Sequence, residues 1–185
     1  MYEVELKFPI ADARPALARL SALGASAAHS VEQADCYFNH PSRDFGQTDE
    51  ALRIRSIGDR HLVTYKGPVI DVQTKTRREI EIPLDGSDAR DKLAEILAQL
   101  GFRAVREVRK SRQPYHLHRD GREFEVAHDQ VVGLGTFLEI ETLASESERP
   151  AAISAIQKLA ADLGLSAPER KSYLCLLLEK TGKNS

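Results

Sequence analysis

Charged and apolar residues alternate at the beginning of the chain. From Glu3 to Phe8 the charged positions are Glu3, Glu5 and Lys7, and an apolar residue follows each of them. Successive side chains of an extended strand point to opposite faces, so such a strand has one charged face and one apolar face. The pattern predicts a strand over residues 2–10 but does not say which face meets water.

Apolar residues spaced three or four positions apart predict four amphipathic helices. A capping residue before each segment or a glycine after it is typical of helix ends. The expected helices cover residues 12–24, 87–101, 150–164 and 169–180. Their apolar faces should lie on a core.

Alternating stretches between these helices predict an extensive sheet. Gly58 next to Asp59, and Asp120 next to Gly121, predict tight hairpins between neighbouring strands. The fold is therefore expected to be α+β with a mainly antiparallel sheet. The expected strands cover residues 2–10, 29–39, 51–56, 61–66, 74–83, 104–113, 115–119, 123–129 and 137–143. One domain over residues 1–180 is expected, with loops at 41–46 and 68–71 and a loose tail at 181–185.

The charged face of the first strand recurs in other strands. Antiparallel sheets commonly turn a polar face to water, so each strand taken singly can be explained as a solvated surface. Carboxylates two residues apart repel one another, however, and several in a confined space call for a divalent cation. Paired like charges stand at Lys75 and Arg77, Glu79 and Glu81, Glu123 and Glu125, Glu139 and Glu141, Arg53 and Arg55, and Lys110 and Arg112.

The helices help to decide between the two faces of the sheet. If helices cover the apolar side, the charged side must point inward, and a sheet closed into a barrel satisfies both conditions. Carboxylate oxygens suit Mg²⁺ or Mn²⁺, while Arg and Lys bind phosphate oxygens. A lumen that holds both signs of charge is chemically suited to a polyphosphate with a metal ion.

The overall composition restricts the partners. The formal net charge is -2, so no global excess of positive charge indicates nucleic acid or an anionic membrane, and any anion site must be local. The chain shows no apolar leader and no apolar run that could cross a bilayer, so we expect a cytoplasmic protein. Cys36 and Cys175 are too few for a metal knuckle or a disulfide framework.

An ordered series of motifs resembles the CYTH domain family, the triphosphate tunnel metalloenzymes. The resemblance covers nearly the whole chain, and its E-x-E-x-K signature matches residues 3–7. The remaining motifs are LRIR at 52–55, YKGP at 65–68, RREIE at 77–81, KSR at 110–112, Asp129 and GLGTFLEIE at 133–141. The start YEVELK, the DCYF motif at 35–38 and the KSY motif at 171–173 are similar to the class IV adenylate cyclase branch.

The resemblance implies a closed eight-stranded antiparallel tunnel with helices packed outside and charged side chains in the lumen. The implied catalytic residues are Glu3, Glu5, Lys7, Glu139 and Glu141. The implied metal ligands are Glu3, Glu5, Glu139 and Glu141, supported by Glu79, Glu81 and Asp129. The implied triphosphate contacts are Lys7, Arg53, Arg55, Lys66, Arg77, Lys110 and Arg112. Lys75 and Arg78 are alternatives to Arg77, and Glu125 either lines the tunnel or pairs with a cation.

The resemblance also implies an enzyme that acts with Mg²⁺ or Mn²⁺ on ATP or another small molecule carrying a triphosphate. We expect an adenylate cyclase that forms cyclic AMP and pyrophosphate. The alternative is a triphosphatase acting on inorganic triphosphate, thiamine triphosphate or a nucleoside triphosphate. A non-catalytic module that binds phosphorylated ligands is a third interpretation, which the paired carboxylates disfavour because excess acid repels phosphate. Exposed strand edges or the last helix could support a homodimer.

Overall fold

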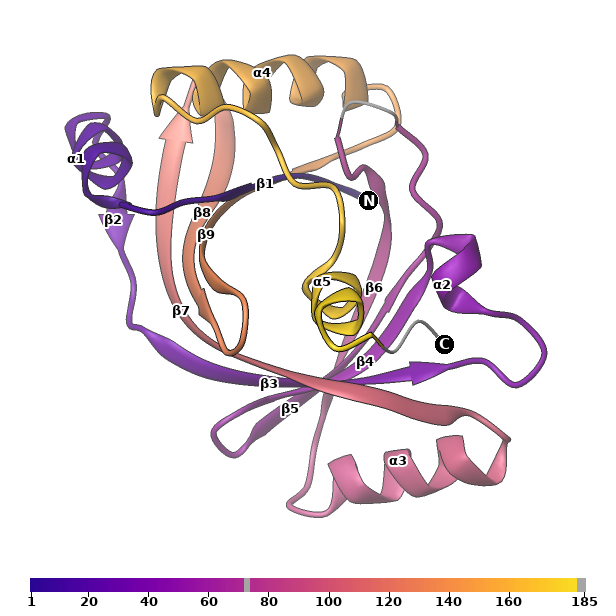
Figure 1. Ribbon diagram of the computed structural model, residues 1–185. Helices are drawn as coiled ribbons and strands as arrows, with labels where there is room; N and C mark the ends of the chain where they lie inside the picture. The colour runs from indigo at the N-terminus through magenta and orange to yellow at the C-terminus, as the bar shows by residue number, and fades with distance from the viewer. Residues whose placement is uncertain (72–73, 183–185) are drawn as a thin grey trace.

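Eight antiparallel strands close into a barrel in the computed structural model, which describes residues 1–71 and 74–182 (Figure 1). The strands are β1 (Tyr2–Pro9), β2 (Ser26–Ala27), β3 (Val31–Asn39), β4 (Ala51–Ile57), β5 (Arg60–Lys66), β6 (Arg77–Leu84), β7 (Arg103–Arg119), β8 (Arg122–Val131) and β9 (Gly135–Ala144). The helices are α1 (Arg14–Ala22), α2 (Phe45–Thr48), α3 (Ala89–Gln99), α4 (Arg149–Asp162) and α5 (Tyr173–Lys180).

The order of the strands explains how the sheet closes. Around the ring the strands follow the order β7, β3, β4, β5, β6, β1, β9 and β8, and β8 pairs with β7. The short β2 pairs with β7 as an addition to this ring. The expected α+β fold with a closed eight-stranded antiparallel barrel and helices outside is therefore confirmed.

Tight turns join neighbouring strands where glycines predicted them. Gly58, with φ of 57°, lies between β4 and β5. Asp120 and Gly121, with φ of 52° and 74°, lie between β7 and β8. Two successive residues with positive φ match the twist of the flanking strands, which is why such turns favour glycine and aspartate.

The apolar face of β1 points outward, against helices. Val4, Leu6 and Phe8 lie in one buried cluster with Leu20 of α1 and Ile156 of α4. Burying one such side chain contributes roughly 1.5–3 kcal/mol, so covering this face with helices outweighs the alternative of exposing it. The opposite, charged face of β1 therefore points into the barrel.

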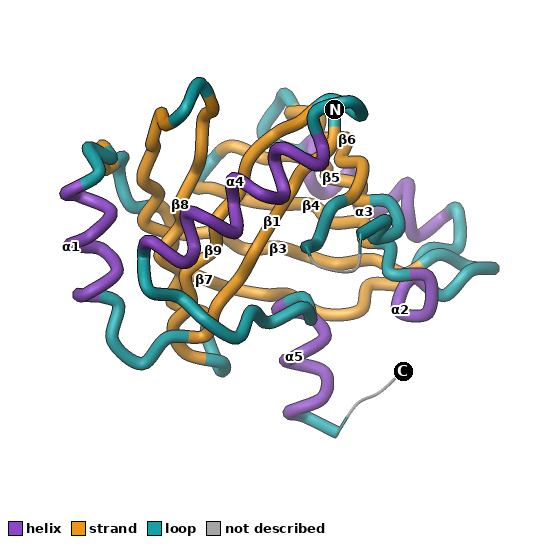
Figure 2. Tube along the Cα trace, turned by 90° about the horizontal axis from the view of Figure 1, so that it is seen from above, coloured by secondary structure: helices purple, strands orange, loops and turns teal. Residues whose placement is uncertain are grey.

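The remaining helices cover other parts of the barrel. Leu97 of α3 packs against Phe38 and Ile54 on the outer side of β3 and β4. Helix α5 is seen nearly end-on within the ring of strands in Figure 1 and lies outside the strands in the perpendicular view, so it is placed at one end of the barrel (Figure 2). None of the helices in the described part of the chain is long and apolar enough to cross a membrane.

One long strand replaces two shorter strands that we expected. β7 continues through Pro114, which pairs with Ala127 of β8. Pro114 lacks an N–H group, but it lies where the other neighbour of β7 changes from β3 to β2, and its carbonyl oxygen accepts from Ala28 N at 2.9 Å. A proline is tolerated at such a break in the ladder, so the proline did not end the strand as predicted.

Three further elements differ from the expectation. α5 begins at Tyr173 and not at Glu169, because residues 169–172 cross the end of the barrel and Glu169 N donates to Lys7 O at 2.7 Å. α2 begins within the expected loop at 41–46, where Asp44 accepts from Gly46 N. β2 was not predicted, since two residues give no readable alternation. Of the expected tail, Thr181 donates to Leu177 O at 3.0 Å, and residues 183–185 lie outside the described residues.

Candidate active site

A cavity of about 1090 Å³ occupies the barrel and is lined by both signs of charge. We call its central lining the charged band. It comprises Glu3, Glu5, Lys7, Arg53, Arg55, Lys66, Lys75, Arg77, Glu79, Lys110, Arg112, Glu139 and Glu141. Several of these side chains are almost fully buried, among them Lys7 at 1% exposure and Lys110 at 4%. Charged groups are rarely buried so deeply without partners, so the pairing within the band determines what it can bind.

Three carboxylates from adjacent strands meet on one wall of the cavity. Glu5 of β1 is directly opposite Glu141 of β9, and Glu3 lies on the same face of β1. One oxygen from each of Glu3, Glu5 and Glu141 lies within 4.8 Å of the others. Burial and the charges of Glu3 and Glu139 raise the pKa of Glu141 well above its usual value, and burial also raises the pKa of Glu3. We call these three residues the carboxylate triplet.

Two lysines and an arginine neutralise the carboxylate triplet unequally. Lys66 Nζ donates to both oxygens of Glu3 at 2.8 and 2.7 Å, and Lys75 Nζ donates to Glu5 Oε1 at 3.3 Å. Glu141 has a more distant cation, since Arg112 Nη1 lies 3.8 Å from its Oε1. The triplet therefore keeps uncompensated negative charge around Glu141.

Asp129 holds a group of cations together on the neighbouring wall. It is fully buried and accepts from Lys110 Nζ at 2.9 Å, Arg112 Nε at 2.8 Å and Tyr173 Oη at 3.0 Å. Arg112 also donates to Glu139. Burial opposes ionisation of Asp129, but the charges of Lys110 and Arg112 outweigh it and lower its pKa. With its oxygens occupied by these donors, Asp129 is better suited to positioning cations than to the predicted supporting role in metal binding.

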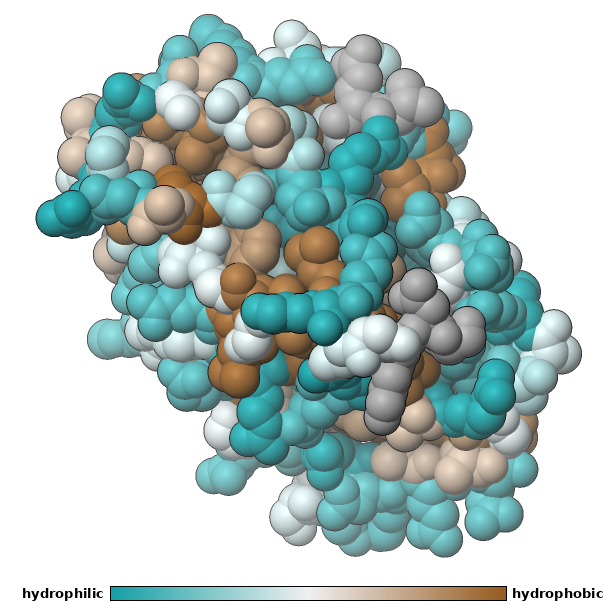
Figure 3. All heavy atoms as spheres, viewed as in Figure 1, coloured by the Kyte–Doolittle hydropathy of each residue, from teal (hydrophilic) through white to brown (hydrophobic). Residues whose placement is uncertain are grey.

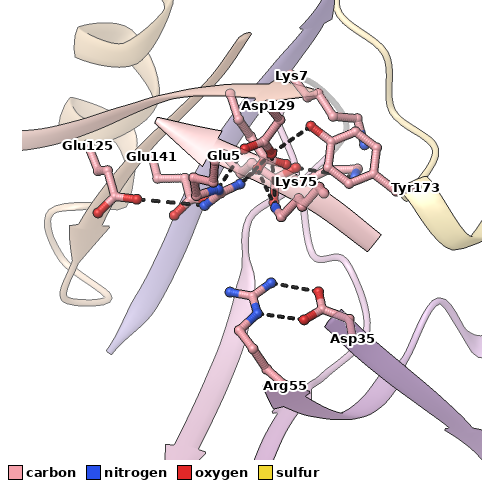
Figure 4. A network of polar contacts seen from close by, with 12 residues as sticks. Glu5, Lys7, Asp35, Arg55, Lys75, Glu125, Asp129, Glu141 and Tyr173 are labelled. Carbon is pink, nitrogen blue, oxygen red and sulfur yellow. Dashed lines mark hydrogen bonds and ion pairs between the residues drawn. The ribbon is translucent and has the colours of Figure 1, made fainter. Parts of the chain in front are cut away.

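A second buried aspartate clamps two arginines across the lumen. Arg55 Nε and Nη2 each donate to Asp35 at 2.7 Å, and Arg53 Nη1 donates to it at 3.2 Å. Figure 4 shows this bidentate pair facing the group formed by Glu5, Glu141 and Asp129. The pKa of Asp35 is lowered because the two arginines outweigh its burial. We call Asp35, Arg53 and Arg55 the arginine clamp. Its guanidinium groups are held in fixed orientations before any ligand arrives.

The alternation of β6 and the segment before it places two of the three residues considered for this triphosphate contact in the cavity. Arg77 is 7% exposed and its Nη1 donates to Asp49 O at 3.4 Å. Lys75 precedes β6 on the same face and is also buried in the lumen, whereas Arg78 is exposed. Arg77 and Lys75 thus both belong to the charged band, and Arg78 does not line the cavity.

The remaining predicted acids lie at different depths. Glu79 is half-buried and its Oε2 lies 3.0 Å from Lys66 Nζ. Glu81 is exposed and accepts from Thr64 Oγ1 at 2.8 Å. Glu125 lines the cavity and lies 3.6 Å from Arg112. None of them joins the carboxylate triplet among the described residues.

Lys7 ends the charged band on the side of α5. Its Nζ donates to Lys171 O and lies 4.3 Å from the centre of the Tyr173 ring. Burial and the neighbouring charge of Lys75 lower the pKa of Lys7 to about 7. Lys7 therefore interacts with charged groups of the lumen and also donates a hydrogen bond to the segment that leads into α5.

Sequence reasoning missed the roles of Asp35 and of Tyr173. Asp35 has no second acid two residues away, so a search for paired charges does not find it. Tyr173 lies on α5 and reaches Asp129 only because that helix covers the end of the barrel. Both residues lie in motifs that carried the branch resemblance, and this was the one signal available for them.

The donor set of the carboxylate triplet fits a hard divalent cation. All three ligand groups offer oxygen, their spacing allows them to share one ion, and their mutual repulsion would be relieved by it. The adjoining cavity has space for water and for phosphate oxygens as further ligands. Glu139 is placed differently, because Arg112 and Lys110 neutralise it and hold its pKa well below the usual value despite burial.

Comparison with known proteins agrees with this geometry. The family model described as "CYTH domain" matches residues 1–173 of the chain. An archaeal protein from Methanocaldococcus jannaschii, provisionally named an adenylate cyclase, is 39% identical over 177 residues, covering 94% of this chain and 97% of that protein. The adenylate cyclase CyaB of Aeromonas hydrophila is 30% identical over 190 residues, covering 100% of this chain and 93% of that protein.

Solved structures share the fold. A Pyrococcus horikoshii protein superposes with a TM-score of 0.84 at 39% identity, covering 96% of this chain and 99% of that one. A Hippeastrum protein, whose structure is reported to reveal a dominant triphosphatase activity, superposes with a TM-score of 0.67 at 19% identity, covering 100% of this chain and 97% of that one.

A closed antiparallel tunnel with acids on one wall and cations around them defines the class of the triphosphate tunnel metalloenzymes. Members of this class use divalent metals and bind triphosphates such as ATP. The chain belongs to the CYTH domain family. The family match and the named relatives support a triphosphate-processing enzyme.

Proposed function

We propose that the protein is an adenylate cyclase that converts ATP into cyclic AMP and pyrophosphate with Mg²⁺ or Mn²⁺. The observation that carries the proposal is the carboxylate triplet facing the arginine clamp across one buried lumen. The names of the two relatives described above favour cyclisation as the reaction.

The cations of the charged band would hold the triphosphate. Arg53 Nε and Arg77 Nε are buried and have no hydrogen-bond partner within the described residues, so they are donors available to phosphate oxygens. The full set assigned to this task is Lys7, Arg53, Arg55, Lys66, Arg77, Lys110 and Arg112. Because the arginine clamp and Asp129 orient several of them in advance, little reorganisation is needed when charge develops on the leaving pyrophosphate.

The carboxylate triplet would hold the metal ion, and a bound ion would stabilise negative charge on the attacking oxygen. In the reaction the ribose 3′-hydroxyl would give its proton to water as its oxygen bonds to the α-phosphorus, and the bond from that phosphorus to the bridging oxygen of pyrophosphate would break. The cations hold the pyrophosphate as its charge increases.

Hydrolysis of a triphosphate is the second candidate. The same cations and carboxylates would serve attack by water on the terminal phosphorus, since both reactions need charge stabilisation along the phosphate chain. The charged band itself contains no group that distinguishes the two reactions. A non-catalytic binding module is disfavoured, because the carboxylate triplet would weaken phosphate binding in the absence of a metal ion.

A product assay tests the proposed reaction. We expect the purified protein to form cyclic AMP and pyrophosphate from ATP with Mg²⁺ or Mn²⁺, and to lose this activity with EDTA. Parallel incubations with inorganic triphosphate and thiamine triphosphate, followed by chromatographic separation, identify the preferred substrate. Orthophosphate without cyclic AMP would replace the cyclase with the triphosphatase, and binding of all three without products would favour the binding module.

The arginine clamp gives a second prediction. Arg55→Lys keeps the charge but loses the bidentate geometry, so inorganic triphosphate should bind roughly tenfold more weakly, as for loss of a charge-assisted hydrogen bond. Titration calorimetry with Mg²⁺ and inorganic triphosphate measures the change. Arg109→Lys is the matched control, because Arg109 lies on β7 with a 68% exposed side chain outside the cavity. Equal affinities of both variants would remove Arg55 from the binding site.

A further inference from the structure

The charged band ends in apolar residues on the side opposite α5. Along three strands, the lumen residue two positions beyond the last polar one is apolar: Val31 follows Gln33, Ile57 follows Arg55 and Leu143 follows Glu141. On β7 the apolar Pro114 follows Arg112 and precedes His116, which also lines the cavity. These four apolar residues come from β3, β4, β7 and β9, and all of them line the cavity. We call Val31, Ile57, Pro114 and Leu143 the apolar collar.

The other end of the charged band is apolar too, but protein side chains already cover it. Tyr37, Val108 and Phe137 lie in a buried cluster with Tyr173 and Leu177 of α5. In the space-filling view from this side, hydrophobic side chains fill the centre of the face where α5 lies (Figure 3). By contrast, the four collar residues belong to none of the hydrophobic clusters among the described residues. Leu143 is 58% exposed there, and the other three residues are half-buried.

The segment before α5 and the helix itself are attached to the barrel at several points. Glu169 N donates to Lys7 O at 2.7 Å, and Lys180 Nζ donates to Gly133 O at 2.7 Å. Tyr173 Oη is bonded to Asp129. A substrate group that entered from this side would have to displace these contacts, whereas the apolar collar is open to solvent.

One polar group lies directly beside the apolar collar and has no partner. Gln33 is 7% exposed and lines the cavity, and its Oε1 has no hydrogen-bond partner within the described part of the chain. On β3 it lies between Val31 of the collar and Asp35 of the arginine clamp. A buried acceptor without a partner is costly, so a ligand that donates a hydrogen bond to it would be favoured.

The end of the cavity near the apolar collar carries both signs of charge. Glu81 and Glu125 line it together with Arg60, which is opposite Ile57, and Arg122, which donates to Leu143 O at 3.1 Å. The orientation of a ligand therefore follows from the contacts that close the α5 end, which leave the collar end for the bulky non-phosphate part.

We propose that the apolar collar and Gln33 bind the non-phosphate end of the substrate, a planar heterocyclic base with an N–H donor. The base packs against Ile57, Pro114 and Val31, and its N–H group donates to Gln33 Oε1. The triphosphate extends from there through the charged band toward Lys7. This assignment rests on the proposed function and adds to it the residues that distinguish a nucleotide from inorganic triphosphate.

Two ligands separate this role from phosphate binding. The probes are inorganic triphosphate and an ATP analogue with methylene bridges at both anhydride positions, each titrated with Mg²⁺ by calorimetry. Gln33→Leu removes the acceptor at nearly constant volume, and Ile57→Asp places a charge in the apolar collar. We expect each variant to bind the analogue roughly tenfold more weakly, as for one lost hydrogen bond, and to bind triphosphate within about twofold of wild type.

Leu178→Asp is the matched control, because Leu178 lines the cavity on the α5 side. We expect it not to change the ratio of the two affinities. A selective loss of analogue binding in Leu178→Asp, with Gln33→Leu unchanged, would place the base at α5 and overturn the proposal. Equal weakening of both ligands by Gln33→Leu would overturn it as well. If the wild type bound the ATP analogue but formed no cyclic AMP from ATP, the proposed reaction would fail while the collar experiment still gave its answer. Thermal melting followed by circular dichroism verifies that each variant is folded. If Ile57→Asp does not fold, Gln33→Leu alone tests the proposal.

Discussion

Replacing Glu141 by Gln is expected to abolish turnover and to leave the protein without metal at least as stable as the wild type. Glu141 is the least neutralised member of the carboxylate triplet, and the two other carboxylates lie within 4.8 Å of it. Removing its charge relieves repulsion in the folded state, and this agrees with its strongly raised pKa. A carboxylate whose folded pKa is raised costs stability when it is ionised at neutral pH, so the uncharged amide removes that cost.

The expected loss of kcat for Glu141→Gln is on the order of 10²–10³-fold, as for removal of a group that stabilises charge in a transition state. Urea denaturation with and without Mn²⁺ measures the predicted change in the free energy of unfolding. The metal should stabilise the wild type, and it should stabilise the variant much less.

Glu32→Gln is the matched control for Glu141→Gln, because Glu32 is an exposed strand glutamate that does not line the cavity. It should resemble the wild type in activity and in stabilisation by metal. Near-normal activity of Glu141→Gln, or a loss of stability without metal, would contradict the assignment of this residue to the metal ion.

Replacing Asp129 by Asn is expected to destabilise the fold by about 3–5 kcal/mol, as for breaking a buried ion pair on one side. Lys110 would be left with Glu139 at 4.0 Å, and Arg112 would be left with Glu139 and the longer contacts to Glu125 and Glu141. Tyr173 would lose the acceptor that helps to fix α5. Urea denaturation at pH 7 should show this loss. Tyr173→Phe removes a single hydrogen bond and should cost only about 1 kcal/mol.

The pH dependence of stability gives an independent check on Asp129. Its folded pKa is lowered, so its ionised form stabilises the protein above the pKa of an unfolded aspartate, near 3.8. That contribution is lost as pH falls through the folded pKa. The stability difference between wild type and Asp129→Asn should therefore shrink below this range. Glu107→Gln, which breaks a largely exposed pair with Arg109, should change stability by less than about 1 kcal/mol at any pH.

The barrel could be predicted from the sequence because its rules are local. Alternation in β1 separates two faces, and the need to cover Val4, Leu6 and Phe8 with helices decides which face is inside. Pro114 misled the prediction of β7, since its effect depends on which strand lies beside it. Whether a proline ends a strand is thus a property of the sheet and not of the residue alone.

The pairing of acids with cations in the lumen was harder to predict from the sequence, because each partner lies on a neighbouring strand. Periodicity places Asp129 and Asp35 on inward faces, but only the register shows that Arg112 is opposite Asp129 and that Arg55 is opposite Asp35. The sequence alone does not distinguish a carboxylate that pairs with lysine or arginine from a carboxylate that is a candidate metal ligand. The difference lies in the number of donors that surround each carboxylate.

The pairing of the first strand with the last one has a consequence for the nascent chain. β1 pairs along its whole length with β9, whereas within the described residues its register with β6 comprises two pairs, Tyr2 with Arg78 and Glu3 with Arg77. Strand pairing over such sequence separation is slow, because loop closure precedes the contacts that stabilise it. During synthesis β1 therefore remains unpaired on its main side until β9 has left the ribosome. The opposition of Glu5 and Glu141 forms when β9 pairs with β1, so the chain cannot assemble the carboxylate triplet before β9 has been synthesised.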